Sequence, residues 1–475
     1  MNRNQSSKSS VASQILIAGS IIWSLLGGGF QILANLQLLV PLVTYFQPLP
    51  VLGFGRLVPA STFLLTYGWI GSGLLGVLMI LVPRFSGIPF RHGRLLSFGA
   101  MAWQLAVLTG LTQILMSGGS GLLSLPYSRS VTLIFLVSFL VLGTGITRGL
   151  GGTWKSGPLL PRLYLLGGIL AFPLGLGTAE LLLRSGTAPG AVQIINQLVW
   201  HSFVHHLWLA PMALVLVFQL LPTLTGRAVT SLPLGILAWG LLLTLGGWAT
   251  NSLASQGPIP SWLQSTGVVA AVLLFVAALG NTVLFQPLLE GRIDEIRRNV
   301  ALRFLTLGSW SYVAAYGWMM FLSIPGVRQN TAFTVAWNAN QTLFLFSFLG
   351  SILAGSIYAL LPVIKNLGWP SHSSLLWHFW CTALGAAMMF VGYALAGILQ
   401  GLALNDPGVP LSTVASYLRP FLVVIIAGQA LWLVGQLAFS SLFFATLLKL
   451  FPLTAPMAVF PPSRDQNTDL AHAQH

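Results

Sequence analysis

The stretch LLWHFWCTALGAAMMFVGYALAGILQGL, residues 375–402, runs for 28 residues without an Asp, Glu, Lys or Arg. A transmembrane helix needs about 20 consecutive apolar residues, because a helix rises about 1.5 Å per residue and the hydrocarbon core is about 30 Å thick. The stretch is therefore long enough to cross a bilayer as one helix. We call residues 375–402 the anchor stretch and compare the rest of the chain with its apolar pattern.

The composition agrees with a membrane protein. Of 475 residues, 55% are hydrophobic and 6% are charged, whereas an average soluble domain carries roughly 25% charged residues. The net charge of +14 does not indicate a nucleic-acid partner, because the basic residues lie singly in short loops and form no patch. The one cysteine, Cys381, lies within an apolar run, which excludes an internal disulfide and a thiolate metal cluster.

Twelve apolar segments are separated by loops that contain Pro, Gly and Arg. They lie near residues 14–45, 59–83, 95–117, 131–147, 160–183, 196–222, 231–253, 265–289, 301–325, 338–364, 373–402 and 418–451. The sequence therefore predicts an all-α integral membrane protein with about twelve transmembrane helices. We expect an N-terminal segment at 1–13, a transmembrane domain at 14–452 and a polar tail at 453–475.

The distribution of basic residues predicts the orientation. With the N-terminus inside, twelve helices place 16 of the 21 Lys and Arg residues in inside segments, namely Arg3, Lys8, Arg84, Arg91, Arg94, Arg148, Lys155, Arg162, Arg227, Arg292, Arg297, Arg298, Arg303, Lys365, Lys449 and Arg464. The other five lie outside: Arg56, Arg129, Arg184, Arg328 and Arg419. Cytoplasmic loops are enriched in Lys and Arg, so both termini are expected in the cytoplasm.

Histidine is the most informative residue type for chemistry. His201, His205 and His206 lie in the stretch WHSFVHHLW, and the first two share a helical face because they are four residues apart. Such a pair supplies two metal ligands where a site usually needs three or four. We interpret the three histidines as packed or interfacial polar residues, with metal or haem ligation as the alternative.

Glu180 is the one carboxylate expected within a span. An acid inside a membrane suggests function by default. However, Arg184 follows it by four residues, a spacing that favours a local ion pair on one helix. The sequence predicts that pair.

Three stretches resemble the catalytic subunit of haem–copper oxidases, most closely the cbb3 type. They are FGRLVPASTFLLTYGW (54–69), PSWLQSTG (260–267) and the anchor stretch with its HFW and AGILQGL motifs. The resemblance extends in order over most of the chain. It implies a twelve-helix bundle in the bacterial plasma membrane that works in a respiratory or electron-transfer complex.

That family depends on six histidines, which hold copper and two haems. The resemblance places their positions here on Ser61, Ser202, Ser252, Leu253, Gln341 and Leu343. Serine and glutamine are poor ligands and leucine has no lone pair. A shift of one residue would put His201 in place of Ser202, but no histidine occurs from Leu207 to Ser371. The family's cross-linked tyrosine corresponds to Gly246.

We therefore expect a non-catalytic paralogue with no haem or copper, which acts as a scaffold for other membrane subunits such as a membrane-anchored cytochrome c subunit. The vacated haem space is expected to hold repacked side chains, lipid or quinone. Two alternatives stay open. One is a haem-binding electron carrier or oxidase with unusual ligation by His201, His205 or His206. The other is a channel or binding site for a gas, a quinone or another small apolar molecule.

Overall fold

The computed structural model describes residues 3–40, 50–86, 90, 92–116, 120, 122, 125–150, 158–184, 190–250, 260–365 and 368–448. Within these ranges the secondary structure is helical. The first half contains α1 (Arg3–Leu39), the 3₁₀ turn η2 (Pro50–Leu52), α2 (Phe54–Phe63), η3 (Leu64–Gly71), α3 (Ser72–Ser86), α4 (Gly93–Leu115), α5 (Arg129–Leu150), α6 (Leu159–Arg184), α7 (Gly190–Ser202), η4 (Phe203–Leu209) and α8 (Ala210–Thr225).

The second half contains α9 (Leu232–Leu245), α10 (Ser261–Leu289), α11 (Ile293–Arg298), α12 (Val300–Ser323), α13 (Pro325–Thr331), α14 (Ala336–Gln341), η6 (Thr342–Leu349), α15 (Gly350–Lys365), α16 (His372–Leu404) and α17 (Leu411–Leu447). Three of the elements, η3, η4 and η6, are π-helical turns inside longer helices.

Ten helical stretches in the described ranges are long and apolar enough to cross a membrane. They account for ten of the twelve predicted segments. The other two correspond to α9, which is apolar but shorter, and to α12, a helix of 24 residues that packs against α10 and α15. The number twelve stays a prediction, and so does the tail at 453–475, which lies outside the described residues.

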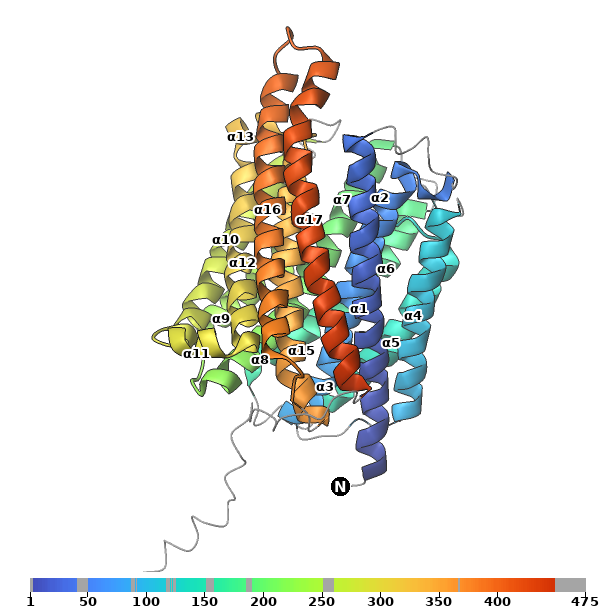
Figure 1. Cartoon of the computed structure of the whole chain (residues 1–475), viewed down its shortest axis with the longest axis vertical. Helices are drawn as coiled ribbons and strands as arrows, with labels where there is room; N and C mark the ends of the chain where they lie inside the picture. Colours follow the sequence, from blue (N-terminus) through green and yellow to red (C-terminus); the bar gives the residue numbers. More distant parts are fainter. Residues whose placement is uncertain are drawn as a thin grey trace, which may run out of the picture.

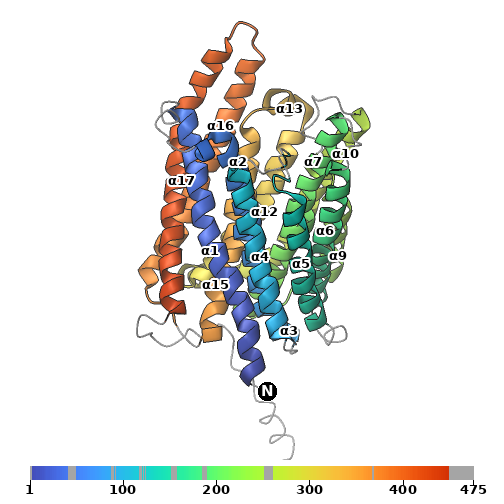
Figure 2. The same cartoon turned by 90° about the vertical axis from the view of Figure 1, so that its right-hand side faces the viewer.

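The helices stand roughly parallel in one elongated bundle (Figures 1 and 2). The start of α1 and the end of α17 lie at the same end of the bundle, so both described ends of the chain share one face (Figure 1). The predicted orientation requires this arrangement, and the placement of that face in the cytoplasm stays a prediction. At the opposite end, α16 and α17 form a hairpin whose tip extends past the other helices (Figure 2).

The hairpin corrects one predicted boundary. The last helix was expected to begin at residue 418, but α17 begins at Leu411. Pro410 precedes the helix at its N-cap, and Pro420 is accommodated inside it. A proline removes one backbone donor and disfavours helix interiors, which explains why the sequence pattern placed the boundary too late.

The motif AGILQGL explains how α16 packs. A Cβ added to Gly401 would lie 1.4 Å from the carbonyl oxygen of Asn330, and one added to Gly397 would lie 2.2 Å from the backbone nitrogen of Ala336. Between them, the Gln400 side-chain oxygen accepts a hydrogen bond from the Val335 N–H at 3.0 Å. The motif therefore brings α16 into backbone contact with α13 and α14.

Replacing Gly401 by alanine should destabilise the protein, because the new methyl group meets the main chain of α13, which cannot rotate away. Overpacking of this kind typically costs about 1–3 kcal/mol. We expect a lower thermal unfolding temperature in detergent. Gly177→Ala is the matched control, since it also adds a methyl group to a helix but has no atom within 4 Å of the new Cβ. Equal unfolding temperatures for the two variants would contradict the backbone contact.

Candidate functional site

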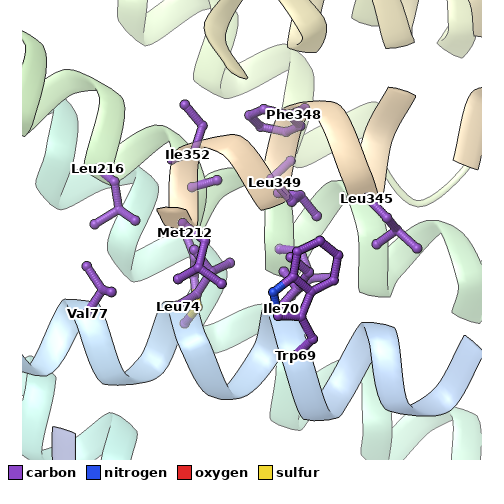
Figure 3. Packing of buried hydrophobic residues seen from close by; sticks show 14 of the residues in the cluster. Trp69, Ile70, Leu74, Val77, Met212, Leu216, Leu345, Phe348, Leu349 and Ile352 are labelled. Atoms are coloured by element: carbon purple, nitrogen blue, oxygen red, sulfur yellow. The ribbon is translucent and has the colours of Figure 1, made fainter. Parts of the chain in front are cut away.

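The centre of the bundle is formed by the three helices that contain π-helical turns. Residues of η3 and α3 face residues of α8 and of η6 and α15 across a tightly packed apolar layer (Figure 3). The labelled members are Trp69, Ile70, Leu74, Val77, Met212, Leu216, Leu345, Phe348, Leu349 and Ile352. π-helical turns are rare and frequently occur at functional sites. The residues beside these three turns are therefore the candidate site residues.

Each π-helical turn lies within three residues of a position at which the resemblance places a family ligand. Ser61 precedes η3 by three residues, Ser202 and Gln341 immediately precede η4 and η6, and Leu343 lies within η6. Ser252 and Leu253 lie outside the described residues. Four of the six positions can therefore be examined directly.

Ser61 is buried and hydrogen-bonded to a neighbouring helix. Its hydroxyl group donates to the Gly27 carbonyl oxygen of α1 at 3.0 Å, and only 3% of the residue is exposed. The side chain thus joins α1 to α2 directly. A larger side chain at this position would have to separate the two helices.

Ser202 forms a second junction. Its hydroxyl oxygen lies 2.7 Å from the hydroxyl oxygen of Thr250 and accepts the Thr250 N–H at 3.0 Å. Both residues are fully buried. Sequence reasoning missed Thr250, because its partner lies 48 residues away and the link depends on the close approach of the end of α7 to the turn that follows α9.

Gln341 binds a histidine of another helix. Its amide Nε2 donates to Nε2 of His201 at 2.9 Å, so that ring nitrogen of His201 is the acceptor. Leu343, two residues on, is partly buried and packs against the apolar core. In this structure the amide of Gln341 is engaged by His201 and the side chain of Leu343 by the apolar core.

The three histidines form one buried group. The rings of His201 and His205 lie 4.1 Å apart between centroids. Nδ1 of His205 donates to the His201 carbonyl oxygen at 2.9 Å, and Nδ1 of His206 lies 2.9 Å from the Tyr316 hydroxyl oxygen. Nε2 of His205 is buried without a hydrogen-bond partner. The described residues contain no group of three or more His, Cys, Asp or Glu side chains that could hold a metal ion.

Tyr316 also adjoins a column of buried polar side chains that sequence reasoning missed. Tyr164 donates to the side-chain oxygen of Asn281 at 3.1 Å, and the Asn281 amide donates to the Tyr312 hydroxyl oxygen at 3.2 Å. The rings of Tyr312 and Tyr316 lie 4.9 Å apart. These four neutral residues join α6, α10 and α12 without a carboxylate.

Indole and phenyl rings fill the space between η3, η6 and α17. Trp432 lies 5.1 Å from Trp69 and 4.8 Å from Phe346 between ring centroids. Glycines make room for the two indoles, since a Cβ at Gly350 would lie 2.6 Å from Trp69 and one at Gly28 would lie 2.7 Å from Trp432. Side chains of the chain itself therefore occupy the space between these helices.

A second aromatic cluster surrounds Trp208 of η4. Its ring lies 4.2 Å from Phe172, 6.0 Å from Tyr67 and 6.0 Å from Trp103. A Cβ at Gly71 would lie 2.9 Å from the Trp208 ring. Trp103, Trp208 and Trp432 are among the largest fully buried side chains, so these tryptophans contribute to helix packing inside the bundle.

Gly246 leaves no room for a side chain. A Cβ there would lie 2.6 Å from the Leu242 carbonyl oxygen, 2.8 Å from Leu207 and 3.2 Å from the Cβ of His206. The position that the resemblance assigns to a cross-linked tyrosine is thus closed by its neighbours.

The ion pair predicted for Glu180 is confirmed. Its carboxylate lies 3.4 Å from Arg184 and also 3.2 Å from Arg129 of α5, and it accepts a hydrogen bond from Thr132 at 2.9 Å. The group joins the ends of α5 and α6. Its partners explain Glu180 as a structural residue.

Comparison with known proteins identifies the family. Residues 11–431 match the family described as cytochrome c and quinol oxidase polypeptide I. The chain belongs to that family. It is a multi-pass membrane protein of the haem–copper oxidase subunit I type, as the resemblance implied.

Two relatives and one solved structure show the extent of the similarity. A "cytochrome c oxidase subunit 1 homolog" of Azorhizobium caulinodans is 24% identical to this chain. The aligned region covers 92% of this chain and 82% of that relative. A "cbb3-type cytochrome c oxidase subunit CcoN1" of Stutzerimonas stutzeri is also 24% identical, and the aligned region covers 88% of this chain and 90% of that relative. A chain of a haem–copper terminal oxidase dimer superposes with a TM-score of 0.72 at 12% identity, covering 96% of this chain and 86% of that chain.

Replacing Ser202 by alanine should destabilise the protein, because it leaves the buried Thr250 N–H without its acceptor. Such a loss costs about 1–3 kcal/mol. Ser265→Ala is the control, since Ser265 is exposed and bonds only within its own helix. A thermal melt in detergent should show a lower midpoint for the first variant alone, and an unchanged midpoint would contradict the junction.

Replacing Trp432 by alanine should open a cavity between η3, η6 and α17. Truncation of a buried tryptophan typically costs about 3–5 kcal/mol. Trp380→Ala is matched in chemistry, but Trp380 is 52% exposed on the surface of α16 and should change the midpoint little. Similar midpoints for both variants would show that Trp432 does not support the centre of the bundle.

Proposed function

We propose that this chain is a cofactor-free subunit of the haem–copper oxidase subunit I type, and that it acts as a scaffold for other membrane subunits in a bacterial respiratory or electron-transfer complex. One observation carries the proposal. The aromatic rings of Trp69, Phe346 and Trp432 pack together at η6, the turn that contains Leu343 and directly follows Gln341.

The residues at the ligand positions do not fit the family's metal centres. Iron and copper in such centres need imidazole nitrogens with a free lone pair. Ser61 and Ser202 instead hold neighbouring helices through hydrogen bonds, and Gln341 is engaged with His201. We therefore derive no step of oxygen chemistry for this chain.

A scaffold role suits what the chain retains. The long helices, the backbone contacts of α16 and the ion-pair group at Glu180 all maintain the bundle. Relatives are named as subunits of cytochrome c oxidases, so the natural partners of this fold are other membrane subunits. Function depends on sites and not on fold, and the sites here favour assembly over catalysis.

The second candidate function is haem binding by the histidine group. One observation favours it: Nε2 of His205 is buried and has no hydrogen-bond partner, and a neutral imidazole nitrogen of this kind is the donor that haem iron takes. Against it, Phe344 lies 5.4 Å from His205 and 5.2 Å from His206 between ring centroids. Haem at this place would have to displace that ring.

Under this proposal the purified protein should contain neither stoichiometric haem nor copper, because Ser61, Ser202 and Gln341 bond to other protein groups and leucine at 343 has no lone pair to donate. The measurement is a dithionite-reduced-minus-oxidised spectrum of protein from its native membrane, followed by haem and copper analysis per chain after the partners are removed. Two haems and one copper on the chain would refute the scaffold proposal. His378 of α16 is the control, since it is also a buried histidine but bonds to Tyr358. A single haem that disappears in His205→Ala and survives in His378→Ala would establish the second candidate instead.

A further inference from the structure

Arg162 is a buried cation that no anionic side chain of the described residues balances. It is the fourth residue of α6 and is 2% exposed. Its Nε and Nη2 atoms are buried without a hydrogen-bond partner, and none of the ion pairs among the described residues includes it. A charge removed from water is stable only beside a charge of opposite sign, so Arg162 requires an anion.

The neighbouring helices contain no carboxylate that could pair with Arg162. The first acidic residue of the chain is Glu180, which lies near the other end of α6 and pairs with Arg129 and Arg184. The elements that pack most extensively against α6 are α5, α7, η4, α8 and α9, and none of them contains Asp or Glu. The anion therefore has to come from outside these helices.

The guanidinium group of Arg162 lies close to the start of α6. Side chains on a helix lean toward its N-terminus, so Arg162 in the first turn extends back toward the end of the helix. Pro158 directly precedes α6 and is exposed, which places this end at the surface of the bundle. An anion that approaches from the end of the bundle therefore meets Arg162 first within α6.

Arg162 also faces the last turn of the preceding helix. Ile169 lies seven residues further along α6 on the same face, and a Cβ added to Gly143 of α5 would lie 3.3 Å from its side chain. Because α5 and α6 are antiparallel, Arg162 lies at the level of the end of α5. Arg148 is in the last turn of α5 and is exposed.

The end of α3 adds a further positive charge. A Cβ added to Gly149 of α5 would lie 2.8 Å from Phe90 and 3.1 Å from Val82 of α3, so the ends of these two helices meet. Arg84 is in the last turn of α3 and is exposed. The end of α3 also lies beside the start of α1 (Figure 2). Cations thus surround the start of α6 without a described acid among them.

We propose that Arg162 and the first turn of α6 bind a phosphate group, carried by an acidic phospholipid or present as free phosphate. A guanidinium group offers donors in a planar fork that fits phosphate oxygens. The first N–H groups of a helix have no intrahelical acceptor and attract the same charge. The inference is independent of the proposed scaffold function, because α6 contains none of the positions assigned to metal ligands.

The first test measures thermal unfolding of the unmodified, delipidated protein in detergent and a chloride buffer. The additions are inorganic phosphate, phosphatidylglycerol and diacylglycerol, which is a lipid without phosphate. An addition that binds should raise the midpoint by about 2–3 °C at about 100 times its Kd. A rise with inorganic phosphate identifies free phosphate as sufficient, and a rise with phosphatidylglycerol alone identifies the lipid. No rise with either, or an equal rise with diacylglycerol, would overturn the proposal.

The second test is Arg162→Met, which removes the charge and keeps a long side chain. Without additions the variant should melt no lower than the unmodified protein, because an unbalanced buried charge is gone. It should also lose the response to phosphate-bearing additions. Arg298→Met is the control, since Arg298 is an exposed arginine of α11 at the same end of the bundle (Figure 1), and this variant should keep the response.

Two results of the second test would contradict the site. A response that survives in Arg162→Met would show that phosphate is attracted to the basic end of the bundle in general. A lower midpoint of Arg162→Met without additions would show that the guanidinium group already has an anionic partner within the protein.

Discussion

Contact between aromatic rings and glycine backbones at the centre of the bundle determines how closely the helices approach. Trp69 packs against Gly350, Trp432 against Gly28 and Trp208 against Gly71. In each case a large ring on one helix occupies the room that a missing side chain leaves on another. Ser61, Ser202, Gln341 and Leu343, which the resemblance assigns to ligand positions, lie in or near the π-helical turns that contain Trp69 and Trp208. Under the scaffold proposal, the packing of the centre and the loss of ligating side chains are two aspects of one structure.

The three π-helical turns connect this packing to the family. A π turn inserts one residue into a helix and changes which side chains face inward beyond it. In this chain the turns adjoin Ser61, Ser202 and Gln341, and they direct Trp69, Trp208 and Phe346 into the core. The chain thus has π-helical backbone close to the positions that the resemblance assigns to the family's metal ligands, and aromatic residues lie on these turns.

Much of the fold followed from the sequence, because hydropathy over 20 residues reports the membrane directly. The Glu180–Arg184 pair was also predictable, since its spacing is local. The link between Gln341 and His201 was not, because it joins residues 140 positions apart. Nor could the inward direction of Trp69 be derived from a regular 3.6-residue period, because the π-helical turn η3 alters that period.

For the candidate site, the resemblance predicted which residues stand at the family's ligand positions. The resemblance assigns Ser61, Ser202, Gln341 and Leu343 to ligand positions, and these residues lie in or near the central turns, while Ser252 and Leu253 lie beyond the described residues. That the four residues replace metal ligands stays a prediction. The choice between repacking and an open cavity could not be made from the sequence, because it depends on the volume between helices. At Ser61 and Trp432 the structure favours repacking.

The glycine–indole contacts have an evolutionary consequence. Returning a histidine to position 61 would place an imidazole where a serine hydroxyl group already touches the Gly27 carbonyl oxygen, and Trp69 and Trp432 would still occupy the neighbouring space. Several coordinated substitutions would be needed before any of them gave a benefit, and each alone would strain the core. Under the scaffold proposal the change is therefore effectively one-way: a lineage that has exchanged its metal ligands for this packing cannot regain them one mutation at a time.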